Sequence, residues 1–142
     1  VPDAETLPCD RAIGRVVAAE VTAPISLPPF RASAMDGYAL RSADAARINP
    51  RRLRVVGASS AGHPFPGEIP ADACIRIFTG AAVPDGLDAV VLQEDCTREG
   101  DVVSIGVAVQ PGDNIRPIGH DVLQNTPLFG PGTCIGPFEQ AW

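Results

Sequence analysis

The sequence predicts a mostly β fold with one or two short helices, on three observations. Glycine (14) and proline (15) together make 29 of the 142 residues, which indicates many turns but not disorder. Several segments alternate polar and apolar residues, as half-buried strands do. The chain lacks the regular alternation of strands and long helices that βαβ folds require. Hydrophobic residues at 45% and aromatic residues at 5% indicate a core of Val, Ile, Leu and Ala.

The N-terminal segment is expected to contain short elements separated by irregular chain. Asp10 is a favoured N-cap and Gly14 a favoured helix stop, so a short helical turn is predicted between them. A strand is predicted for 15–23, which reads RVVAAEVTA. Three prolines make 24–32 irregular or extended, because the residue before a proline avoids the helical conformation.

The stretch SAMDGYA contains an Asp-Gly pair, Asp36–Gly37, between apolar residues. Such a pair is the usual signal of a hairpin turn, since both residue types tolerate positive φ. A turn alone does not explain the small Ser33 before the pair or the aromatic Tyr38 after it. The stretch is therefore interpreted either as a turn only or as a turn that is also a functional loop.

The rest of the chain has mainly β character. Alternation of polar and apolar residues begins at Arg52, and clusters of Gly, Pro, Asp and Asn separate the apolar segments. Strands are predicted at 52–59, 73–80, 87–95 and 102–109. Turns are predicted at 83–86, 97–101 and 111–114, and a turn-rich loop at 61–70. One helical turn capped by Ser42 is predicted at 42–48, and a last short hairpin of PLF with TCI within 127–135.

Charge and cysteine usage limit the classes of function. With 11 basic and 17 acidic residues the net charge is −6, which argues against nucleic acid or an anionic membrane as a partner. The four cysteines form no C-x-x-C motif, so neither a zinc site nor a redox pair is indicated. Reduced, buried thiols in a cytoplasmic protein are expected. The two histidines lack metal-ligand spacing.

Three places combine a polar side chain, a glycine and a predicted strand end: Asp36–Gly37, Thr79–Gly80 and the Gly-His-Asp of 119–121. Functional residues collect at such loops on a β scaffold. Each place also has an ordinary structural explanation, namely an Asx turn, a strand end and a solvated loop acid. The functional interpretation requires that the three lie together, which the linear sequence leaves open.

Three motifs, in this order and spacing, carry a resemblance to a known family: LPPFRASAMDGYALRSAD, GHPFPGEIPADACIRIFTGAAVPDGLDAVVLQED and GDNIRPIGHD. Together they resemble the MoeA/gephyrin family of molybdopterin molybdenumtransferases over nearly the whole chain. The resemblance implies the N-terminal subdomains only: an elongated β subdomain built from 1–23 with 125–142, and a central β-rich domain, 24–124, that carries the active-site loops. The chain is expected to be a fragment, without the family's pterin-binding domain.

The resemblance also implies an activity and a site. Family members form homodimers in the cytoplasm, cleave adenylylated molybdopterin with Mg²⁺ and insert molybdate. Carboxylates hold Mg²⁺ directly or through water, and a hydroxyl can donate to an oxyanion. One departure is that His120 stands where the family usually has Glu. By motif, the resemblance implies catalytic roles for Asp36, Thr79 and Asp121, magnesium binding by Asp36 and Asp121, and cofactor binding by Ser33, Gly80, Glu94 and Arg116.

Two classes of function remain open at this point. The chain is either the accessory half of a molybdenumtransferase, active only with the missing domain, or a non-catalytic scaffold or binding module like gephyrin. The joint presence of Asp36, Thr79 and Asp121 favours the enzyme, because a scaffold needs none of them. A free-standing hydrolase is disfavoured, because no nucleophile–base pair is evident.

Overall fold

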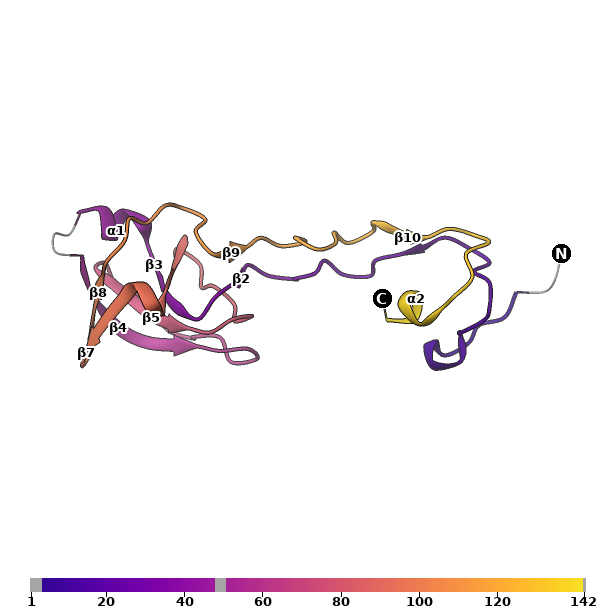
Figure 1. Ribbon diagram of the computed structural model, residues 1–142, viewed down its shortest axis with the longest axis horizontal. Coiled ribbons are helices and arrows are strands. Elements are labelled where there is room, and N and C mark those ends of the chain that lie inside the picture. The colour runs from indigo at the N-terminus through magenta and orange to yellow at the C-terminus, as the bar shows by residue number, and fades with distance from the viewer. Residues whose placement is uncertain (1–3, 48–50, 142) are drawn as a thin grey trace. The chain divides into compact units, whose positions relative to one another are not determined.

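The computed structural model describes residues 4–47 and 51–141, and its mostly β fold with few short helices confirms the predicted fold class (Figure 1). The chain divides into two compact units. The end unit joins Val1–Leu27 with Asp121–Trp142, and the central unit is Pro28–His120. The domain boundaries expected from the sequence, 1–23 with 125–142 around 24–124, stay a prediction.

The end unit is made from the two ends of the chain (Figure 1). Strand β1 pairs antiparallel with β10, and Val16 forms a further bridge with Cys134. The strand predicted for 15–23 is therefore wrong over most of its length. The predicted hairpin of PLF with TCI is also wrong, since each of these segments pairs with the start of the chain instead. The elements of this unit are η1 (Cys9–Arg11), β1 (Val21–Thr22), β10 (Pro127–Phe129) and α2 (Pro137–Gln140).

The central unit is built on a six-stranded sheet of order β6-β3-β5-β4-β8-β7, with a separate antiparallel pair, β2–β9. Only β4 and β5 are parallel, and a crossover loop without a helix connects them. The ring of Phe65 anchors this loop against Gly57, where a Cβ atom would lie 2.2 Å from the ring. The elements are β2 (Ala32–Ser33), β3 (Gly37–Leu40), α1 (Ser42–Arg47), β4 (Arg52–Ser59), β5 (Ala73–Ile77), β6 (Ala89–Leu92), η2 (Gln93–Asp95), β7 (Cys96–Glu99), β8 (Val102–Ile105) and β9 (Ile115–Arg116).

Both faces of this sheet are covered, which explains the nearly continuous apolar runs in the sequence. Successive residues of a strand point to opposite faces, so Tyr38 and Leu40 enter one core cluster while Ala39 enters the other. Ile75 and Ile77 of β5 belong to the second cluster and are fully buried. The two clusters fix the register of the central strands, since a slip of one residue would exchange the faces.

The sheet is curled, and its connections explain why. Strands β6 and β7 are its two edges, yet only the three residues of η2 join them. Such a short connection requires the two edges to approach one another. The backbone N–H of Gly106, just after β8, donates to the carbonyl of Asp95 in η2 at 2.9 Å and extends the β7–β8 pairing into η2.

The Asp36–Gly37 pair does not form the hairpin turn that the sequence predicts. Strand β2 before it pairs with β9, whereas β3 after it pairs with β5 and β6. Neither residue is among the described residues with positive φ. Glycine is required at position 37 for a different reason: a Cβ atom there would lie 1.8 Å from the carbonyl oxygen of Val91. The close approach of β6 therefore selects the glycine.

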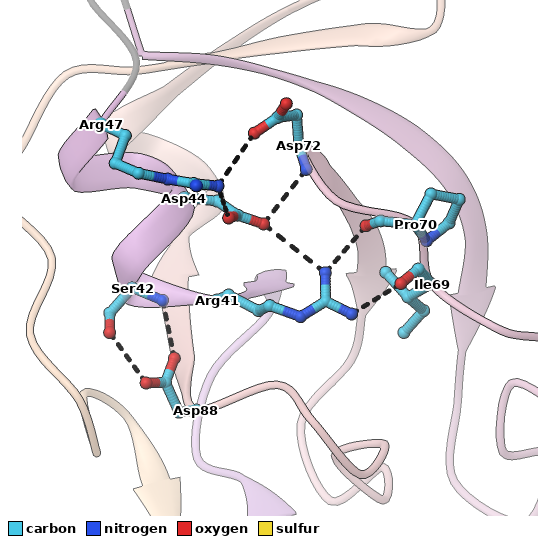
Figure 2. A network of polar contacts seen from close by, with 8 residues as sticks. All are labelled: Arg41, Ser42, Asp44, Arg47, Ile69, Pro70, Asp72 and Asp88. Carbon is cyan, nitrogen blue, oxygen red and sulfur yellow. Dashed lines mark hydrogen bonds and ion pairs between the residues drawn. The ribbon is translucent and has the colours of Figure 1, made fainter.

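A buried acid, Asp44, anchors α1 to the loop before β5 (Figure 2). Its Oδ1 accepts from Arg47 at 2.7 Å, and its Oδ2 accepts from the backbone N–H of Asp72 at 3.1 Å. Arg41 lies 3.5 Å from the same Oδ2 and also donates to two loop carbonyls. Ser42 does not cap the helix as predicted; its backbone N–H and its hydroxyl both donate to Asp88.

The cysteines are all free, and burial differs among them. Cys74 is buried and Cys96 is half-buried, but Cys9 and Cys134 are exposed. The expectation of buried thiols is therefore wrong for the two cysteines of the end unit, where few side chains are covered. None of the helices in the described part of the chain has the length and apolar character needed to cross a membrane.

Candidate functional site

The fold brings Asp36 and Thr79 together from positions 43 residues apart. Asp36 immediately precedes β3, and Thr79 follows β5 by two residues. The two strands are antiparallel neighbours, with Gly37 opposite Ile77. The start of one strand and the end of the other therefore lie at the same end of the sheet, as expected for antiparallel pairing.

Thr79 fixes one oxygen of the Asp36 carboxylate. The backbone N–H and the hydroxyl of Thr79 both donate to Asp36 Oδ1, each at 2.8 Å. These two bonds, the backbone bond first, lower the pKa of Asp36 below its ordinary value of 3.8, and the charge of Arg76 acts in the same direction. Asp36 is exposed, and no hydrogen bond or ion pair within the described residues uses its Oδ2. The second oxygen is therefore available to a ligand.

The turn that carries Thr79 is held by backbone hydrogen bonds to β2. The N–H of Gly80 donates to the carbonyl of Ser33, and the N–H of Ser33 donates to the carbonyl of Ala81, both at 2.9 Å. Gly80 has φ of +79°, a conformation that favours glycine. Ser33 is only 1% exposed, and its hydroxyl donates to the carbonyl of Met35 at 2.7 Å. Binding of a cofactor by Ser33 and Gly80 stays a prediction.

Glu94 lies in η2, the connection between the sheet edges. Its side chain is exposed and accepts from Gln93 Nε2 at 3.2 Å. It lines a cavity of about 370 Å³ together with residues of β7, β8 and the segment that follows β8. Asp95 of η2 and Thr97 of β7 add further polar side chains to the lining of this cavity. A role for Glu94 in binding stays a prediction.

Arg116 and Asp121 belong to different compact units of the chain. Arg116 is a half-buried residue of β9, opposite Ala32 of β2 in the central unit. Asp121 is an exposed residue of the end unit, and its backbone N–H donates to the carbonyl of Leu27 at 2.9 Å. The described residues contain no group of three or more His, Cys, Asp or Glu side chains placed to hold a metal ion. Magnesium binding by Asp36 and Asp121 stays a prediction.

Sequence reasoning missed two residues beside Asp36, namely Arg76 and Gln93. Arg76 donates to the carbonyl of Gly37 at 2.9 Å and to the side-chain oxygen of Gln93. The N–H of Gln93 donates to the carbonyl of Asp36 at 3.1 Å. A signal for Arg76 exists in the sequence: it is the only charged residue within the apolar strand ACIRI. Gln93 has no comparable signal.

The site thus presents a fixed, exposed carboxylate beside a threonine hydroxyl and an arginine at one end of a curled β sheet. Such a set can hold a hydrated cation or orient an oxyanion, but it contains no activated nucleophile. The family model for the MoeA N-terminal region (domain I and II) matches residues 1–142. The chain belongs to this family.

Individual relatives agree with the family. A molybdopterin molybdenumtransferase of Haemophilus influenzae is 39% identical over 134 residues, which are 94% of this chain and 33% of that protein. Gephyrin of Dictyostelium discoideum is 34% identical over 93% of this chain and 20% of its own length. The crystal structure of a MoeA protein from Pyrococcus horikoshii OT3 superposes with a TM-score of 0.91 at 35% identity, covering 99% of this chain and 38% of that one. The chain spans about a third or less of the curated relatives cited here.

Proposed function

We propose that this chain is the N-terminal part of a molybdopterin molybdenumtransferase and acts in molybdenum cofactor biosynthesis. In this proposal it supplies acidic and hydroxyl groups to a Mg²⁺-dependent site that cleaves adenylylated molybdopterin and accepts molybdate. The rest of the site comes from a pterin-binding domain of a longer homodimeric protein in the cytoplasm. Family membership and relatives named molybdopterin molybdenumtransferase support this reading.

The observation that carries the proposal is the state of Asp36. A carboxylate that only closes a turn needs no open oxygen, whereas Asp36 is exposed and has one oxygen fixed by Thr79 and the other without a partner in the described chain. An aspartate is ionised at physiological pH even at its ordinary pKa of 3.8, and the two bonds from Thr79 lower the pKa of Asp36 further. A scaffold surface gains nothing from this arrangement.

The chemistry of the Asp36 carboxylate suits a magnesium ion. Mg²⁺ prefers oxygen ligands, keeps several waters and is usually bound through one or two carboxylates with substrate phosphates. Asp36 Oδ2 would supply one carboxylate from the central unit, and a role for Asp121 rests on the sequence motif alone. When bound, the ion would neutralise charge on the phosphate oxygens of the substrate. Thr79 meanwhile orients Asp36, and its hydroxyl oxygen keeps lone pairs for a further donor.

The test is molybdenum insertion by the full-length transferase that contains this chain. With adenylylated molybdopterin, molybdate and Mg²⁺, we expect release of AMP together with molybdenum bound to the pterin, and we expect EDTA to abolish both. The isolated 142-residue chain should do neither. A full-length protein that releases no AMP and inserts no molybdenum under these conditions would contradict the proposal and favour the scaffold alternative.

A further inference from the structure

Arg76 occupies an unusual position for a charged residue. It lies in the middle of the sheet, on β5, where it is half-buried and directly opposite Tyr38 of β3. Its guanidinium centre is 5.3 Å from the ring centroid of Tyr38 and 4.8 Å from that of Phe78. No ion pair of Arg76 occurs among the described residues. Its charge is therefore held by aromatic faces and neutral acceptors rather than by a carboxylate.

The two acceptors of Arg76 are neutral oxygens beside the candidate site. Nη1 donates to the carbonyl of Gly37, the residue that follows Asp36, and Nη2 donates to the side-chain oxygen of Gln93. Phe78, on which the guanidinium lies, immediately precedes Thr79. One planar group thus contacts the chain next to both partners of the Asp36–Thr79 pair.

Gln93 extends this connection to a second acid. Its backbone N–H donates to the carbonyl of Asp36 at 3.1 Å, and its side-chain Nε2 donates to Glu94 Oε1 at 3.2 Å. The amide group of its side chain therefore joins Arg76 to Glu94, while its backbone joins η2 to the loop before β3. Gln93 is exposed, so this arrangement is not required to fill the core.

We propose that Arg76 and Gln93 are positioning residues of the candidate site: together they set the orientation of the Asp36 carboxylate and of the Glu94 side chain at the same end of the sheet. The kinetic part of the test rests on the proposed function. The structural part is measured on the 142-residue chain alone and does not depend on that function.

The test uses four variants that separate charge from geometry. Arg76→Met removes the charge and both donors but keeps an apolar stem over the rings. Arg76→Lys keeps the charge but cannot donate to two acceptors in a fixed plane. Gln93→Ala removes the bridge to Glu94. Arg98→Met is the matched control, because Arg98 lies on β7 of the same sheet and its side chain donates, among the described residues, to the carbonyl of Gly100 rather than to a residue of the candidate site.

The first readout is amide hydrogen exchange of Thr79 in the 142-residue chain, because the N–H of Thr79 donates to Asp36 Oδ1. This N–H should exchange several-fold faster in Arg76→Met, Arg76→Lys and Gln93→Ala, and at the wild-type rate in Arg98→Met. The second readout is the kcat and KM of the full-length transferase. Loss of a residue that orients a site group typically costs tens of fold. We therefore expect kcat to fall on the order of tenfold in Arg76→Met, Arg76→Lys and Gln93→Ala, with KM little changed.

Each outcome decides the proposal. A wild-type kcat in both Arg76→Lys and Gln93→Ala, with an active parent, would overturn it, and so would a rise in KM alone, which would mark a substrate contact. If Arg76→Met does not fold, Gln93→Ala decides, since its side chain is exposed. If the parent enzyme inserts no molybdenum, the proposed function fails, and hydrogen exchange still decides the positioning: wild-type exchange of the Thr79 N–H in both Arg76→Met and Gln93→Ala overturns it.

Discussion

Two aspartates of the central unit show how the same side chain serves different ends. Asp44 is 3% exposed, and both its oxygens are engaged by Arg41, Arg47 and the backbone of Asp72 (Figure 2). Asp36 is exposed, and within the described part of the chain one of its oxygens is engaged, by Thr79, while the other is not. A fully engaged acid stabilises the fold, because every partner would lose a bond without it. A half-engaged acid is held in place and can still bind something else.

Two predicted strands show what the sequence can and cannot reveal about the fold. Strand β4 at Arg52–Ser59 was predictable with its bounds because polar and apolar residues alternate along it. The strand predicted for 15–23 is wrong because its partner segment contains Pro127, Pro131 and two glycines, which cannot supply a continuous ladder. Local pattern predicts a strand only where the distant partner can pair with it.

The contact between Asp36 and Thr79 could not be predicted from the local sequence. Thr79 stands out as a Thr-Gly at a strand end and Asp36 as an Asp-Gly, yet their contact follows from the register of β3 on β5, which no local pattern contains. The hairpin interpretation of Gly37 is wrong because the reason for this glycine, the carbonyl of Val91, lies 54 residues away in the chain (91 − 37). The contacts of Arg76 with Gly37 and Gln93 are non-local in the same way.

The largest expected effect is a loss of stability of the central unit, and it should come from Gly37→Ala. A methyl group 1.8 Å from the Val91 carbonyl forces β3 and β6 apart, and overpacking of this kind costs about 3 kcal/mol or more. The central unit should lose most of its stability, and Asp36 its position. Urea unfolding followed by circular dichroism measures this, with Gly130→Ala as the control, because Gly130 is not among the described residues with positive φ and a Cβ atom there would meet nothing within 4 Å. A free energy of unfolding equal to that of the control would show that the carbonyl of Val91 does not lie this close to position 37.

The next largest effect should come from Asp44→Ala. The change leaves the N–H of Asp72 without its acceptor and removes one partner each from Arg41 and Arg47, at a cost of about 2–3 kcal/mol. Asp85→Ala is the control, because Asp85 is fully exposed and its pairing with Arg31 should contribute little. Thermal melts compare the two. Equal melting temperatures would mean that the Asp44 network in Figure 2 is not stabilising, and the contrast with Asp36 would disappear.

A smaller effect is expected from Thr79→Val on the titration of Asp36. The backbone N–H remains and is the largest cause of the lowered pKa, so the pKa should rise but stay below 3.8. Because the folded pKa is lowered, the ionised carboxylate stabilises the fold above pH 3.8 and loses this effect as the pH falls through the folded value. Carboxyl ¹³C NMR measures the shift. A pKa at 3.8 in the variant would show that the hydroxyl, not the backbone, fixes Asp36.

The most direct measurement compares Asp36→Asn with Asp44→Asn in the full-length transferase, by molybdenum inserted per folded protein. Asp36→Asn keeps the shape but removes the charge from an exposed site, so its melting temperature should stay within about 2 °C of wild type. Its insertion rate should fall on the order of tens to thousands of fold, as for lost electrostatic contacts elsewhere. Asp44→Asn should show the reverse, a lower melting temperature with insertion per folded protein unchanged. Insertion by Asp36→Asn at the wild-type rate across magnesium concentrations would contradict the account.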